Sequence, residues 1–125
     1  SRPIARGLSP HAPYSVHPAL LDQIVDVARK AGCPLAMHVA ESAEELELLD
    51  RGSGPLVELL RELKVWQGGL YARGSRPLDI LRTLSRAPRA LVVHGNFLGP
   101  QDREFLSGQQ QMTVVYCPRT HAAFG

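Results

Sequence analysis

Short apolar runs recur along this chain with helix-forming segments between them, and this alternation constrains the fold more than any other feature. The runs that contain Leu91-Val92-Val93 and Thr113-Val114-Val115-Tyr116 are continuously apolar, which is typical of parallel strands buried on both faces. The first run is weak because Arg6 and Gly7 interrupt it. The four expected strands are Ile4–Ser9, Pro34–His38, Ala90–His94 and Met112–Cys117.

The segments between these runs carry apolar residues at helical spacing. Pro18 suits the first turn of one helix and Gly32 suits its end. The stretch 65–76 holds three glycines and predicts an irregular loop. Strands that alternate with helices imply parallel βαβ units with right-handed crossovers, so the predicted fold class is α/β. The expected helices are Pro18–Ala31, Ser42–Gly52, Pro55–Lys64, Pro77–Arg86 and Pro100–Leu106.

Four of the five histidines follow the predicted strands at their carboxyl ends. They are His11, His38, His94 and His121. Active sites of α/β barrels are built at this end, and open α/β sheets bind ligands at the same edge. One such histidine alone is more often an ordinary polar residue, but four at one edge indicate a functional site. His17 precedes Pro18 at a helix start, so we expect a capping or surface role for it.

Glu41 follows His38 by three residues and can lean over the same pocket. A neutral imidazole binds a divalent ion, the ion lowers the pKa of water, and a nearby carboxylate can move the proton. Glu41 could instead merely open the next helix, where the helix dipole favours an acid. Ser42-Ala43-Glu44-Glu45 matches the capping-box pattern of that helix. We therefore expect a solvated helical face at Glu44, Glu45 and Glu47.

Composition excludes several classes of protein. The formal net charge is only +2 and the charges are scattered, so neither nucleic acid nor a membrane surface is an expected partner. The chain has no Gly-rich phosphate loop and no Gly-x-Ser-x-Gly elbow. Cys33 and Cys117 do not make a disulfide framework, so a cytoplasmic setting is the default. A small-molecule substrate remains the expected partner, and homo-oligomerisation stays open.

Four sequence blocks occur in an order that resembles the amidohydrolase superfamily, in its branch of cytosine-deaminase-like, chlorohydrolase-like and S-adenosylhomocysteine-deaminase-like enzymes. The blocks are Ser9-Pro10-His11-Ala12-Pro13-Tyr14-Ser15, His38-Val39-Ala40-Glu41-Ser42, Val93-His94-Gly95-Asn96 and Tyr116-Cys117-Pro118-Arg119-Thr120-His121. The resemblance covers essentially the whole chain. It implies a metal-dependent hydrolase on a distorted (β/α)₈ barrel.

The resemblance also implies a role for individual residues. His38 and His94 would be ligands of one divalent metal ion, zinc in the first place, with iron or manganese open. His94 would also count as catalytic, and Glu41 would shuttle the proton between the metal-activated water and the leaving group. His11 would contact the substrate or the developing oxyanion. Many relatives carry Pro-x-Ser-Asn after the seventh strand, where this chain has Pro118-Arg119-Thr120-His121.

That departure suggests that Arg119 or His121 meets an anionic or polar group of the substrate, although Arg119 could instead pair with a structural acid. The family's other metal ligands, a His-x-His pair and an Asp on the first and eighth strands, do not appear. A full barrel needs about 250 residues for eight units, so four units need about 125. We therefore expect residues 1–125 to be the central half of a catalytic barrel domain, over strands four to seven.

The expected reaction is hydrolysis of an amidine-like or amide carbon–nitrogen bond, with deamination of a nitrogen heterocycle first. Hydrolytic dechlorination or amide hydrolysis would use the same machinery with another leaving group. A non-catalytic, degenerate barrel that serves as a scaffold is the alternative from another class of protein.

Overall fold

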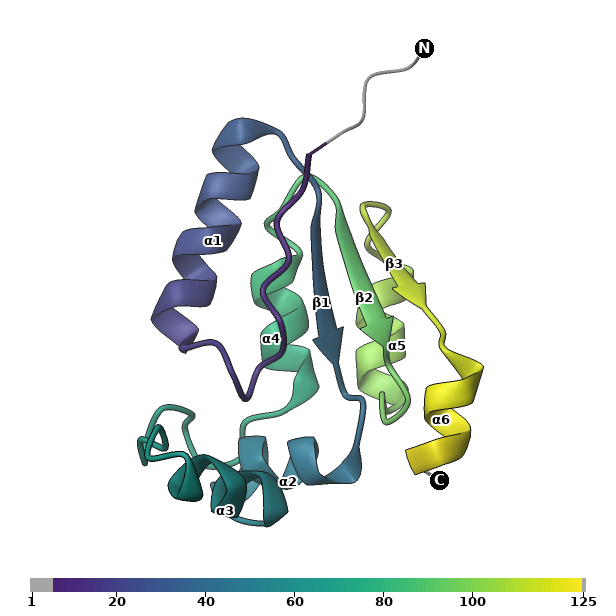
Figure 1. Cartoon of the computed structure of the whole chain (residues 1–125). Coiled ribbons are helices and arrows are strands. Elements are labelled where there is room, and N and C mark those ends of the chain that lie inside the picture. Colours follow the sequence, from purple (N-terminus) through teal and green to yellow (C-terminus); the bar gives the residue numbers. More distant parts are fainter. Residues whose placement is uncertain (1–5, 125) are drawn as a thin grey trace.

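A computed structural model describes residues 6–124 of the chain as a mixed α/β structure. Three strands, β1 (Leu35–Val39), β2 (Ala90–His94) and β3 (Met112–Val115), form one parallel sheet in the order β1-β2-β3 (Figure 1). The register pairs Leu35 with Ala90 and Val92 with Val114. All three strands therefore end at the same edge of the sheet, as the alternation of strands and helices predicts.

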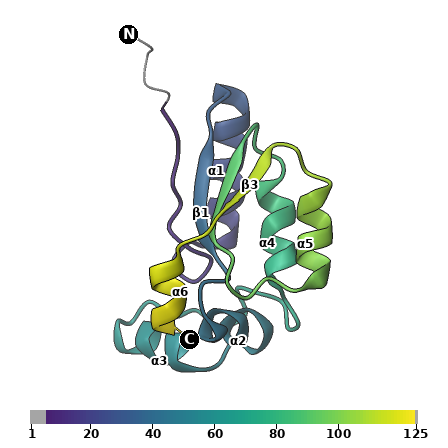
Figure 2. The same cartoon turned by 90° about the vertical axis from the view of Figure 1, so that its right-hand side faces the viewer.

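Six helices accompany this sheet within residues 6–124. Helices α4 and α5 cover one face, while α2 and α3 lie beyond the carboxyl ends of the strands (Figures 1 and 2). Apolar side chains of β1 and β2 form the core with those of α1, α2 and α4, including Met37, Val92, Val25, Leu48 and Leu81. The helices are α1 (Pro18–Ala31), α2 (Ala43–Arg51), α3 (Pro55–Glu62), α4 (Pro77–Leu84), α5 (Pro100–Ser107) and α6 (Pro118–Phe124).

Helix α1 begins and ends as its sequence predicts. The side chain of His17 accepts a hydrogen bond from the backbone N–H of Ala19 at 3.0 Å, so it caps the helix at the surface. Gly32 ends the helix with a φ of 66°, a left-handed conformation that glycine adopts without a steric penalty. The expected capping role of His17 is confirmed.

The first expected strand is not formed as predicted. Residues 4 and 5 lie outside the described part, and the rest contributes only one isolated parallel bridge, between Leu8 and Leu35. Backbone hydrogen bonds still hold this segment beside β1, from Leu8 to Pro34, Ala36 to Leu8 and His38 to His11. The segment therefore brings His11 to the end of β1 without being a regular strand.

The last expected strand is shorter and more exposed than predicted. β3 ends at Val115 rather than Cys117, and Pro118 begins helix α6, which the sequence analysis did not anticipate. Within β3 only Met112 is buried, and the following three residues are exposed. The prediction of burial on both faces is wrong here, because β3 is the edge strand of the sheet and the described residues place no further strand beside it.

Within residues 6–124, no helix combines the length and the apolar character that crossing a membrane requires.

Candidate active site

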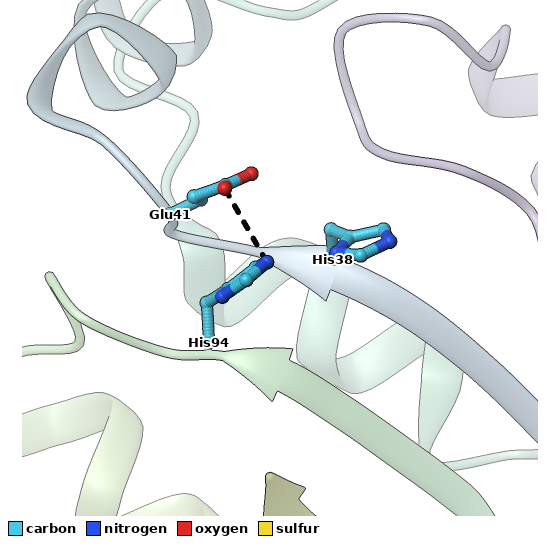
Figure 3. A group of neighbouring side chains, drawn as sticks. All are labelled: His38, Glu41 and His94. Carbon is cyan, nitrogen blue, oxygen red and sulfur yellow. Dashed lines mark ion pairs between the residues drawn. The ribbon is translucent and has the colours of Figure 1, made fainter. Parts of the chain in front are cut away.

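The site begins at the carboxyl end of β1, where His38 occupies the position before the last residue of the strand. Met37 and Val39 point into the core, so alternation along the strand turns the half-buried His38 to the other face. After Val39 the chain leaves the extended conformation at Ala40, which has a φ of 53°. This turn places Glu41 over the end of the sheet, beside His38 (Figure 3).

His94 approaches the same place from β2, where it is the last residue of the strand. Its register partner is Val39 rather than His38, so regular strand geometry would turn its side chain away from His38. The φ of His94 is instead 76°, and the chain departs from the strand at this residue. The imidazole rings of His38 and His94 stack with their centroids 5.0 Å apart.

Three side chains thus converge at the carboxyl edge of the sheet (Figure 3). Nε2 of His94 lies 3.3 Å from Oε1 of Glu41, and the two side chains are only 7% and 20% exposed. One nitrogen or oxygen atom from each of His38, Glu41 and His94 can be chosen so that all lie within 4.8 Å of one another. The sequence predicted this meeting from the positions of these residues after two apolar runs.

Electrostatics keep His38 neutral. Its removal from water lowers the pKa of its imidazole below the usual value, and the neighbouring His94 and His11 lower it further. The charge of Glu41 acts in the opposite direction but does not reverse the shift. At neutral pH the ring of His38 therefore offers a free lone pair, as a metal ligand must.

The three residues fit a divalent metal ion. The Nδ1 atoms of His38 and His94 are buried and have no hydrogen-bond partner among the described residues. Buried polar nitrogen atoms are seldom left without a partner. Two imidazoles and a carboxylate are donors that suit zinc, and also iron or manganese.

The other predicted site residues are placed differently. His11 is exposed, but its ring lies edge-on to that of His38 at a centroid distance of 5.5 Å, and its Nδ1 lies 2.7 Å from the Ser15 hydroxyl. His121 lies on α6, with Nδ1 2.9 Å from the hydroxyl of Tyr116. Arg119 is exposed on the same helix, and within residues 6–124 neither it nor His121 has a recorded contact with His38, Glu41 or His94.

Two polar residues near the site have roles that the sequence pattern did not predict. Glu45 was expected on a solvated helical face, but it is 0% exposed, and its carboxylate accepts hydrogen bonds from the backbone N–H groups of Ala40 and Glu41. Asn96 donates its side-chain N–H to the carbonyl of Glu41 at 3.1 Å. The capping-box pattern was the available signal for Glu45, because the glutamate of such a box turns back toward the main chain.

A separate cavity of about 930 Å³ lies among α2 and the starts of α4 and α5. Its lining includes Glu47, Arg51, Arg76 and Phe97 but none of the three converging residues. The candidate active site is therefore distinct from this hollow.

The protein has a parallel sheet with two histidines and a glutamate at its carboxyl edge. It therefore belongs to the class of α/β proteins whose functional sites lie at the carboxyl ends of parallel strands. The chain belongs to the amidohydrolase family, because the model of that family matches residues 4–122. The resemblance carried by the four sequence blocks is thereby confirmed.

Curated relatives in this family are named as deaminases. An aminodeoxyfutalosine deaminase of Deinococcus radiodurans is 35% identical over 124 residues, which cover 92% of this chain and 29% of the relative. A 5-methylthioadenosine/S-adenosylhomocysteine deaminase of Shouchella clausii is 31% identical over 119 residues, covering 94% of this chain and 23% of the relative. The chain thus spans less than a third of the length of each of these two relatives.

Solved structures share the fold. The aminofutalosine deaminase of Helicobacter pylori superposes with a TM-score of 0.76 at 24% identity, over 90% of this chain and 28% of that one. An adenosine deaminase of Xanthomonas campestris with bound zinc gives a TM-score of 0.64 at 23% identity, over 95% of this chain and 23% of that one. At sequence identities of 24% and 23%, this structural similarity establishes a shared fold.

Proposed function

We propose that residues 1–125 form the central half of an amidohydrolase-type catalytic barrel, over strands four to seven, and that the complete protein hydrolytically deaminates a nitrogen heterocycle. The observation that carries this proposal is the convergence of His38, Glu41 and His94 within the part of the chain that matches the family. The names of the two relatives described above point to the same reaction. A cytoplasmic setting and a small-molecule substrate belong to the same proposal.

In this proposal His38 and His94 hold one divalent metal ion, zinc in the first place. Such an ion, when bound, supplies a Lewis acid and makes water a stronger nucleophile at neutral pH. The low pKa of His38 favours this role because its imidazole needs no deprotonation before it binds.

Glu41 moves the proton. Water adds to the ring carbon that carries the amino group, and the Glu41 carboxylate accepts a proton from that water. The carboxyl then delivers the proton to the amino nitrogen, the carbon–nitrogen bond breaks and ammonia leaves. The proton of the added hydroxyl group passes to the neighbouring ring nitrogen, so a carbonyl group remains on the ring. The close contact of Glu41 with His94 supports this assignment because it holds the carboxylate at the site. His11, beside His38, contacts the substrate or its developing negative charge.

The end of β3 contributes to substrate binding in the same proposal. Arg119 and His121 follow this strand on α6. Both offer hydrogen-bond donors to an anionic or polar group of the substrate. In this proposal they contact a part of the substrate away from the reacting carbon, and so determine which substrate is bound.

The test is turnover by the complete polypeptide that contains this chain. Ammonia release is measured with 5-methylthioadenosine, S-adenosylhomocysteine and aminodeoxyfutalosine, and chloride release with chlorinated heterocycles. We expect ammonia release, and a fall in kcat of about 10²–10⁴-fold in Glu41→Gln with its metal content unchanged. Chloride release alone would establish dechlorination instead. A metal-loaded protein without any turnover would favour a scaffold.

A further inference from the structure

The turn that carries Glu41 has a complete set of main-chain hydrogen bonds, made partly to side chains that lie outside the turn. The N–H groups of Ala40 and Glu41 both donate to the carboxylate of Glu45, at 2.5 and 3.5 Å. The carbonyl of Ala40 accepts from the N–H of Phe97, and that of Glu41 accepts from the side chain of Asn96. All four polar main-chain groups of these two residues are therefore engaged.

The carboxylate of Glu45 is costly to keep where it lies. It is fully buried, and among residues 6–124 no ion pair with a cation is recorded for it. Burial of a carboxylate without a cation is unfavourable, and an apolar side chain in this position would avoid that cost. The hydrogen bonds that Glu45 accepts come from the turn before its helix.

These bonds differ from an ordinary helix cap. In a capping box the glutamate bonds the N–H of the N-cap residue, which here is Ser42. Glu45 instead reaches past Ser42 to the two preceding residues. One of them, Ala40, has a left-handed φ of 53°, which a residue with a Cβ adopts at a cost and keeps only where surrounding contacts enforce it.

We propose that Glu45 and Asn96 are positioning residues, which hold the main chain of Ala40 and Glu41 from opposite sides so that the Glu41 carboxylate stays against His94. This inference rests on the proposed function, because it concerns the residue that moves the proton there. Neither positioning residue touches the substrate. Asn96 links the turn to the chain after β2, and Glu45 links it to α2.

The test is a double-mutant cycle in the complete protein. Glu45→Gln removes one of the two acceptor oxygens and turns an amide donor toward a backbone N–H group. We expect kcat to fall by about 10–100-fold, as when a residue that orients a metal ligand is lost. KM and metal content stay close to their original values. Glu44→Gln, on the exposed face of the same helix, is the matched control and keeps its activity.

The background variant Glu41→Gln gives the test its specificity. If Glu45 acts through Glu41, then Glu45→Gln lowers kcat in the original protein but adds no loss to Glu41→Gln. A further loss of the same size in that background would show a general structural role and overturn the proposal. Unchanged kcat in Glu45→Gln beside an impaired Glu41→Gln would overturn it as well, while leaving the proposed function intact.

The same variants also cover two further outcomes, normal turnover in Glu41→Gln and failure of Glu45→Gln to fold. Normal turnover in Glu41→Gln would remove the proposed role of Glu41, and the positioning role with it. Should Glu45→Gln fail to fold, Asn96→Ala takes its place, because it releases the same turn from the other side. A loss of kcat that disappears in the Glu41→Gln background supports the proposal, and an unchanged kcat contradicts it.

Discussion

The carboxyl ends of β1 and β3 lie at the same edge of one sheet but are built differently. After β1 the turn is buried, its main chain is fully hydrogen-bonded, and its side chains meet those that follow β2. At the end of β3, Val114 and Val115 of the strand and Tyr116 directly after it are 42%, 37% and 58% exposed. There the recorded hydrogen bonds join His121 to its own neighbours, Tyr116 and Cys117.

This difference separates the part of the site that the chain forms by itself from the part that depends on other groups. The first part requires only contacts between β1, α2 and β2, all of which lie within residues 6–124. Parallel sheets are normally covered on both faces, so the exposed end of β3 needs a partner. In our proposal the remaining strands and helices of the barrel supply it.

The largest expected difference between the two ends is in metal binding and turnover. His94→Ala in the complete protein should lose its metal and at least about 100-fold in kcat, because even residues that only orient a ligand cost 10–100-fold. His121→Ala should keep its metal and change mainly KM. Metal analysis beside steady-state kinetics measures both. Equal loss of metal in the two variants would show that the end of β3 belongs to the metal site.

Proton-linked stability should come from the end of β1. Burial raises the pKa of Glu45 from 4.5 to about 7; the hydrogen bonds from the N–H groups of Ala40 and Glu41 oppose this shift, and the nearby charge of Glu41 adds to it. Between these values the folded protein holds a proton that the unfolded chain has released. The contribution of Glu45 to stability is therefore full below pH 4.5 and falls as the pH rises toward 7, by roughly 1 kcal/mol for each pH unit. The lowered pKa of His38 contributes with the opposite sign, because the unfolded chain binds a proton there more readily than the folded protein.

Urea unfolding across this pH range measures the effect. Glu45→Gln should remove the decline, whereas Glu44→Gln should keep it. Tyr14 and Tyr71 do not titrate in this range, because burial raises the pKa of both, that of Tyr71 to about 12. A decline that persists in Glu45→Gln would assign it to another group.

A smaller effect compares two valines that are paired across β2 and β3. Val92 is 0% exposed, so Val92→Ala should cost about 2 kcal/mol in unfolding free energy, from two lost methyl groups and the cavity they leave. In the chain of residues 1–125 alone, Val114→Ala should cost less than about 0.5 kcal/mol, as exposed substitutions do.

In the complete protein the two costs should become similar, because a neighbouring strand and helix would cover Val114. Chemical denaturation of both forms provides the comparison. A negligible cost for Val114→Ala in the complete protein would mean that β3 stays exposed there, against the proposed barrel.

The sequence predicted the features that depend on local pattern. The apolar runs located β1 and β2, and the positions of His38, Glu41 and His94 after them indicated one group. The burial of Glu45 was missed because it depends on how the preceding turn folds back over this residue. The spacing of residues within the helix does not predict the conformation of that turn. The exposure of β3 was missed because an apolar run indicates that a strand needs to be buried. It does not indicate whether another strand or helix is present to cover it.

The parallel order of the strands also determines when the site can assemble. The bond between Glu45 and Ala40 spans five residues, so it can form as soon as α2 does. The bond from Asn96 to Glu41 spans 55 residues and requires β2 to pair with β1 first. At about 5–20 residues per second of synthesis, that separation corresponds to roughly 3–11 s. The hydrogen bond from Ala40 to Glu45 can thus form early in translation, whereas the bond from Asn96 to Glu41 forms only after β2 has been synthesised.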